Sequence, residues 1–189
     1  MNDIVSQLQY LLISLQANIP LSLMIMGIFW GVHFINVILG YRLNRLGILP
    51  RHILGLPGIF TSPFLHGDFN HLFFNSIPLF VLINLLLLSG LANFISVTFM
   101  IIVLSGIAIW LLGRRGFHVG ASSLIMGYWG YLIVNAYQNP SIITAVLAVV
   151  CLYYFGGLII NLFHAEEGMS WEGHVFGFLA GVATNFLLK

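Results

Sequence analysis

The chain has 189 residues, of which 60% are hydrophobic and only 6% are charged, and its formal net charge is +1. Soluble domains carry about 25% charged residues, so this composition cannot supply a water-facing surface. It predicts a polytopic membrane protein that contacts the lipid bilayer, and the small net charge gives no electrostatic reason to expect a nucleic-acid partner. The single cysteine excludes an internal disulfide.

The hydrophobic segments predict an all-α bundle of six membrane-spanning helices, forming a single domain over residues 1–189. We expect residues 1–17 to form an interfacial or short amphipathic lead-in, and they lack the basic cluster of a cleaved signal peptide. Residues 41–68 contain three prolines and are expected to form a loop at the membrane interface. The predicted spans are 19–39, 70–88, 94–112, 122–137, 142–163 and 173–188.

The fourth predicted span is short. About 16 residues of helix reach only about 24 Å, against a hydrocarbon core of about 30 Å. We therefore expect other helices to surround it.

The parity of the spans brings three polar residues to one side of the membrane. With six spans, the second, fourth and sixth helices all enter from the same side. His71 lies near the start of the second, Ser122 at the start of the fourth and His174 at the start of the sixth. The sequence therefore predicts that these side chains lie at a similar depth.

Ser122 follows a small-residue turn, Gly120-Ala121, at the start of an apolar helix. A nucleophilic serine needs a base and donors for the oxyanion, and free N–H groups at a helix N-terminus supply part of the second requirement. The alternative is that Ser122 and Ser123 cap or pack the helix, as serines often do in membranes.

His174 is the histidine best placed to act as a base on the last helix. Gly177 and Gly181 follow it on one helical face, which permits close approach of a neighbouring backbone. We expect that face to meet the small residues of the fourth helix. The alternative is an interfacial histidine hydrogen-bonded to a loop carbonyl. The small positions of the fourth helix are Gly120, Ser123, Gly127 and Gly130.

His71 and Asn75 lie four residues apart on one face of the second helix. As side-chain donors they fit an oxyanion hole, and His66 in the preceding loop is expected to support the site. The alternative is that the pair joins helices as polar contacts. No acidic residue lies well inside a span, so the arrangement predicts a Ser–His dyad.

We expect His33 and His118 to be structural. The loop at 164–167 carries a histidine and two glutamates, but the His-Glu-x-x-His spacing of zinc proteases is absent. We therefore expect no metal and no other cofactor.

Together these residues resemble the rhomboid family of intramembrane serine proteases, over about residues 60–189. The family's His-x-x-x-x-His-x-x-x-Asn pattern stands here as His66, His71 and Asn75. Its Gly-x-Ser stands as Gly120-Ala121-Ser122, and its His-x-x-Gly-x-x-x-Gly as His174, Gly177 and Gly181.

The resemblance implies a serine endopeptidase with the basic six-helix fold. Ser122 would be the nucleophile and His174 the base, and the backbone N–H of Ser122 would join His71 and Asn75 in the oxyanion hole. The substrates would be single-span membrane proteins cut near the end of the transmembrane helix, in the inner membrane of a bacterium.

The sequence departs from the family pattern at three places. Ser123 follows the nucleophile where the family usually has glycine, and Met126 stands where an aromatic residue is frequent. The Trp-Arg pair of many members' first loop is absent, so the resemblance leaves the anchoring of this loop unassigned.

Membrane orientation and the alternatives to a protease remain open at this point. Five arginines fall on the predicted site's side and only Lys189 on the other, which favours a cytoplasmic site, whereas the resemblance implies an external one. One alternative is a catalytically inactive rhomboid-like protein that binds membrane clients. Others are a channel or carrier, which the lack of intramembrane acids and inverted repeats disfavours, and a metal-dependent protease. The five arginines are Arg42, Arg45, Arg51, Arg114 and Arg115.

Overall fold

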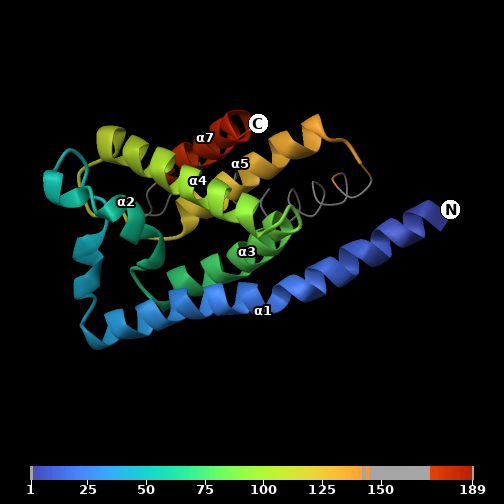
Figure 1. Ribbon diagram of the computed structural model, residues 1–189. Helices are drawn as coiled ribbons and strands as arrows, with labels where there is room; N and C mark the ends of the chain where they lie inside the picture. Colours follow the sequence, from blue (N-terminus) through green and yellow to red (C-terminus); the bar gives the residue numbers. More distant parts are fainter. Residues whose placement is uncertain (1, 142–143, 145–170, 189) are drawn as a thin grey trace.

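The computed structural model describes residues 2–141, 144 and 171–188. In these residues five long helices form a bundle, and short helical turns make up much of the connection between the first two (Figure 1). The long helices are α1 (Asn2–Ile38), α3 (Phe69–Leu87), α4 (Leu91–Leu112), α5 (Ser122–Gln138) and α7 (Trp171–Leu187). The short elements are η1 (Arg42–Leu46), η2 (Ile53–Gly55), α2 (Gly58–Thr61) and η3 (Ser62–Phe64).

Five of the six predicted spans fall on these long helices, and the fifth, 142–163, lies outside the described residues apart from Thr144. Among the residues that the structure describes, three helices are long and apolar enough to cross a membrane, namely α1 from Val5 onward, α3 and α4. Helices α5 and α7 have 17 residues each and reach about 26 Å. In the described part of the chain, the only β-type pairing is an isolated bridge between Ile48 and His118.

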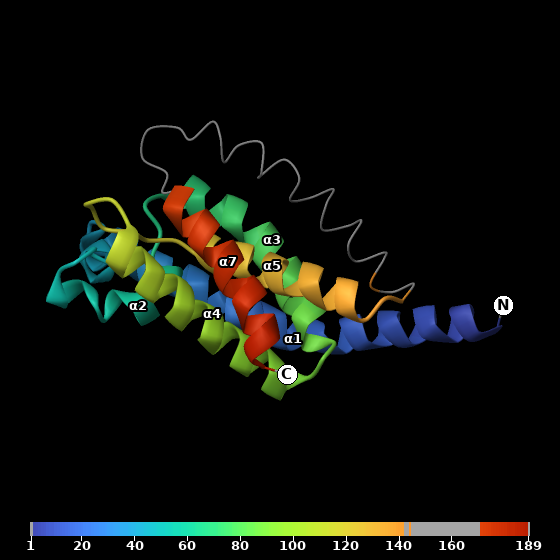
Figure 2. The ribbon, with the colours of Figure 1, turned by 90° about the horizontal axis from the view of Figure 1, so that it is seen from above.

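Helix α1 differs from the prediction at its N-terminal end. The sequence predicts a separate lead-in before residue 19, but the helix runs without a break from Asn2 through Pro20. Its first part projects beyond the other described helices in both views of the bundle (Figures 1 and 2). Proline removes one backbone donor from a helix, a loss that membrane helices tolerate.

Helix α5 lies at the centre of the bundle. Its residues 123–131 are all buried, and it contacts α3, α4 and α7. A helix too short for the hydrocarbon core is therefore covered by protein rather than lipid, as the sequence predicted.

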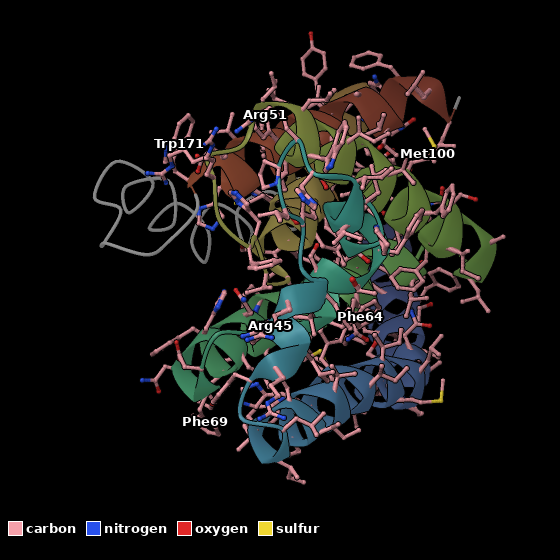
Figure 3. All side chains as sticks on the ribbon, turned by 90° about the vertical axis from the view of Figure 1, so that its left-hand side faces the viewer. Arg45, Arg51, Phe64, Phe69, Met100 and Trp171 are labelled. Carbon is pink, nitrogen blue, oxygen red and sulfur yellow. The ribbon has the colours of Figure 1, made fainter. Side chains whose placement is uncertain are left out.

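The three helices that carry the predicted site begin at the same end of the bundle. Phe69 and Trp171, the first residues of α3 and α7, lie at the edge of the face shown in Figure 3, and α5 begins beneath it. Arg45 and Arg51 lie on this face as well (Figure 3). The three helices therefore begin at the same end, as the parity of the spans predicted; the similar depth of the three side chains stays a prediction.

The connection between α1 and α3 is anchored to the end of α4. The Arg51 guanidinium donates from Nη1 to the carbonyls of Leu111 and Gly113 at 3.1 and 2.9 Å. Trp110 Nε1 donates to the His52 carbonyl at 2.9 Å. Carbonyls at a helix C-terminus lack intrahelical donors and favour a cation. Arg51 and Trp110 therefore supply the anchor that the resemblance left unassigned.

Candidate functional site

The site begins with the packing of α5 against α7. A Cβ added to Gly177 would collide with the backbone of Ser123, and one added to Gly181 would collide with the backbone of Gly127. Both contacts join residues 54 apart in number. One turn further along, the Asn185 amide reaches the Tyr131 carbonyl at 3.5 Å with the same offset. The two helices are therefore parallel, and their glycine faces meet as the sequence predicted.

This register places the start of α7 next to the turn before α5. The same offset, continued back by one turn from Gly177, would set His174 near Gly120, which lies in the turn before α5. His174 and Ser122 are both partly buried. The predicted base and nucleophile therefore begin adjacent, parallel helices. No hydrogen bond joins their side chains within the described residues. Catalytic hydrogen bonds often form only in the complex with substrate.

Gly120 brings the turn against α3. Its φ is +122°, and its N–H donates to the Ser62 carbonyl at 3.0 Å. A Cβ at this position would lie 2.7 Å from Cε1 and 2.8 Å from Nε2 of His71, and 3.9 Å from Nδ2 of Asn75. Only glycine combines this dihedral with so close an approach to the imidazole.

The amide of Asn75 is a donor without a partner. Its Nδ2 atom is buried, and the described part of the chain gives it no hydrogen-bond acceptor. Buried polar groups are almost always hydrogen-bonded, so an unpaired donor calls for an explanation. Because it lies over Gly120 beside His71, it faces the backbone that leads into Ser122.

Ser122 is the first residue of α5 and not its N-cap. The N-cap position is Ala121, which offers no side-chain hydrogen bond to the helix. Ser122 therefore does not have the capping role that was the alternative explanation of this serine. Ser123 is buried, and its backbone is the surface on which Gly177 packs.

His66 holds the turn from behind. It is fully buried, and its Nε2 accepts the N–H of Ala121 at 3.4 Å. Its ring meets His71 edge-on, with centroids 5.1 Å apart, and His33 at 6.5 Å. Burial, together with the neighbouring His71, lowers the pKa of His66 to about 3. His66 is therefore neutral at physiological pH, with its proton on Nδ1 and Nε2 free to accept.

This burial predicts a pH dependence of folding. The His66 pKa is about 3 in the folded chain and about 6.5 when unfolded. Below pH 6.5 the unfolded state binds a proton at His66, whereas the folded state does not. The free energy of unfolding therefore falls by about 1.4 kcal/mol per pH unit from this group, down to pH 3. His66→Gln keeps an acceptor for Ala121 and should remove that part of the slope. The check is the unfolding free energy in detergent from pH 7.5 to 4; an unchanged slope in the variant would refute it.

Two features of this end of the bundle were missed or undervalued in the sequence. His33 on α1 is buried and lies against His66, so it belongs to the histidine cluster behind the site. Glu172, which the sequence did not single out, is buried in α7 and pairs with Arg114. Neither partnership has a sequence signal, because each joins residues more than 30 positions apart.

Comparison with known proteins decides the family. The family model of the Rhomboid domain matches residues 55–189, which include every predicted site residue. The chain belongs to the rhomboid family. The polytopic helical membrane fold predicted from composition and spans is thereby confirmed.

Similar rhomboid-family chains occur in mycobacteria. The chain is 36% identical over 167 residues to the uncharacterized protein Rv1337 of Mycobacterium tuberculosis, covering 84% of this chain and 70% of that protein. The same values hold for the uncharacterized protein Mb1372 of Mycobacterium bovis. The uncharacterized protein ML1171 of Mycobacterium leprae is 32% identical over 174 residues, covering 87% and 68% of the two chains.

Proposed function

We propose that this rhomboid-family protein is an intramembrane serine endopeptidase, with Ser122 as nucleophile and His174 as general base. The observation that carries the proposal is the Gly120 turn. It lies against His71 and the unpaired amide of Asn75 on one side, and we infer from the register of α5 and α7 that His174 lies on the other. Nucleophile, base and oxyanion donors thus converge on one short backbone segment.

The proposed chemistry uses each of these groups in turn. His174 takes the hydroxyl proton of Ser122 as its oxygen attacks a peptide carbonyl, and then donates that proton to the leaving amine. The oxyanion accepts hydrogen bonds from Asn75 Nδ2, from the His71 imidazole and from the Ser122 backbone N–H. Water then hydrolyses the acyl-enzyme, and the same histidine serves as base again.

The proposed dyad has no acidic third residue to orient its imidazole, so another feature must do so. We propose that packing supplies this orientation: the ring of His71 is held between His66 and the Gly120 backbone, and α7 is fixed by its glycine face. His66 contributes by holding the Ala121 N–H, which keeps the turn in place.

The proposed substrates are single-span membrane proteins. The three helices α3, α5 and α7 begin at the same end of the bundle (Figure 1). We propose that this end lies near one face of the membrane, so that a segment at the end of a transmembrane helix can reach the site. A helical backbone keeps its carbonyls hydrogen-bonded, so a substrate must unwind locally. We expect spans with Gly or Pro near one end to be cut faster than polyleucine spans. The proposed location is the inner membrane of a bacterium.

The test is reconstitution of the purified chain in proteoliposomes with two single-span substrates. One carries a Gly-Pro step near the end of its span, and its matched control has leucines there. Cleavage of the first substrate at that end, unaffected by chelators, is the expected result. Capture of the substrate without cleavage would contradict the protease and favour a client-binding rhomboid relative.

A further inference from the structure

The start of α7 is held by a buried carboxylate. Glu172, the second residue of the helix, is only 2% exposed. The Arg114 side chain donates to it from Nε to Oε1 at 2.5 Å and from Nη2 to Oε2 at 3.1 Å. The backbone N–H of Arg114 adds a third hydrogen bond to Oε1 at 3.3 Å. A bidentate guanidinium pair of this kind fixes geometry as well as charge.

The loop that bears Arg114 is itself fixed. Nε2 of His118 lies 2.9 Å from the Arg114 carbonyl, which closes the loop between α4 and α5. The backbones of His118 and Ile48 exchange two hydrogen bonds, at 3.0 and 2.9 Å. The α1–α3 connection, the α4–α5 loop and the start of α7 therefore form one linked set of contacts.

These contacts bear on the proposed dyad because Arg114 precedes Ser122 in the chain and Glu172 precedes His174. Arg114 lies in the loop that continues into Gly120 and Ser122, and Glu172 lies two residues before His174. Residues i and i+2 of a helix do not face each other, so Glu172 and His174 lie on different sides of α7. Glu172 therefore acts on the imidazole through the helix backbone and not as the acid of a triad.

We propose that the Arg114–Glu172 ion pair is a positioning device that sets the distance between the segment carrying Ser122 and the segment carrying His174. This inference rests on the proposed function. The glycine contacts hold α5 and α7 together from Gly177 towards their C-terminal ends. The ion pair holds the N-terminal ends of the two segments, which carry the proposed reacting groups. Misplacement of catalytic groups by about 1 Å lowers rates up to about 100-fold.

The two partners differ in exposure, which makes the effects of their removal unequal. The Arg114 side chain is 64% exposed and that of Glu172 only 3%. The hydrogen bonds to Glu172 raise the pKa of Arg114 above its usual value. Glu172→Gln leaves the arginine in water, whereas Arg114→Gln removes the guanidinium from a buried carboxylate and should lower thermal stability more.

The experiment measures kcat and KM for the Gly-Pro substrate in proteoliposomes, together with the thermal unfolding midpoint in detergent. The variants are Glu172→Gln, Arg114→Lys and the double variant Arg114→Gln/Glu172→Gln. The control is Arg115→Gln, which removes the adjacent exposed arginine, for which the described residues offer no ion-pair partner. We expect Glu172→Gln to lower kcat by about 10- to 100-fold with KM within about twofold. Arg114→Lys, which keeps the charge, should be intermediate, and Arg115→Gln should match the wild type.

The double variant keeps the proposal testable if a single variant folds poorly, because it replaces both the buried carboxylate and its guanidinium partner by neutral amides. We expect its kcat to equal that of Glu172→Gln, because the two substitutions remove the same ion pair. Wild-type kcat in Glu172→Gln or in the double variant, or a loss confined to KM, would overturn the positioning role. A wild-type chain that cuts no substrate would contradict the proposed function instead.

Discussion

Ser122→Ala should lower cleavage by at least about 10⁴-fold, whereas Ser123→Ala should stay within about threefold of the wild type. The two serines are adjacent, but they differ in surroundings. Ser122 is partly exposed at the start of α5, next to the Gly120 turn. Ser123 is buried, with its backbone against Gly177 on the α7 side. Because we propose that only Ser122 faces His174 and the oxyanion donors, only its loss should remove the nucleophile.

The measurement is the initial rate for the Gly-Pro substrate in proteoliposomes, with both variants reconstituted at equal protein-to-lipid ratio. Ser123→Ala is the matched control, since it removes the same atom one residue away. Loss of activity in Ser123→Ala with retention in Ser122→Ala would move the nucleophile by one residue. Equal activity in all three proteins would contradict a serine mechanism.

Gly181→Ala should both destabilise the protein and slow cleavage. The added Cβ would fall on the Gly127 carbonyl, so α7 must move away from α5. Overpacking of this kind typically costs about 1–3 kcal/mol. Because we propose that the same interface positions His174 near the Gly120 turn, we also expect cleavage to fall by about 10-fold or more. Thermal unfolding in detergent and the cleavage rate report the two effects separately.

The control for this substitution is Gly31→Ala on α1. Gly31 lies inside a helix and is exposed, and an added Cβ there would meet nothing within 4 Å. Alanine is favoured over glycine in a helix by up to about 1 kcal/mol, so this variant should be at least as stable as the wild type. If Gly181→Ala also behaved like the wild type, close packing of α5 on α7 could not be what positions the site.

Much of this arrangement could be predicted from the sequence because it depends on periodicity and small residues. The meeting of the α5 and α7 glycine faces followed from Gly127, Gly177 and Gly181, and the common entry side of α3, α5 and α7 followed from parity. Both are consequences of a bilayer, which requires complete helices and rewards close contact of small residues.

The features that could not be predicted are contacts between side chains that are distant in the sequence and meet only in the folded chain. The length of α1 was underestimated because residues 1–17 were expected to form a separate lead-in, whereas the helix runs from Asn2 through Pro20. The α1–α3 connection contains two positive-φ residues, Tyr41 and Arg51, and its anchor on α4 comes from side chain to carbonyl hydrogen bonds. Such contacts leave no periodic pattern. Glu172 was undervalued for the same reason, since its partner stands 58 positions away.

The central claim is that Ser122 is activated by His174, and covalent labelling tests it most directly. Wild-type protein in proteoliposomes would be treated with a fluorophosphonate, which reacts with activated serines, and the adduct located by mass spectrometry of its peptides. We predict a single adduct on Ser122 that His174→Ala abolishes. An adduct on Ser123, or unchanged labelling of Ser122 in His174→Ala, would contradict the dyad.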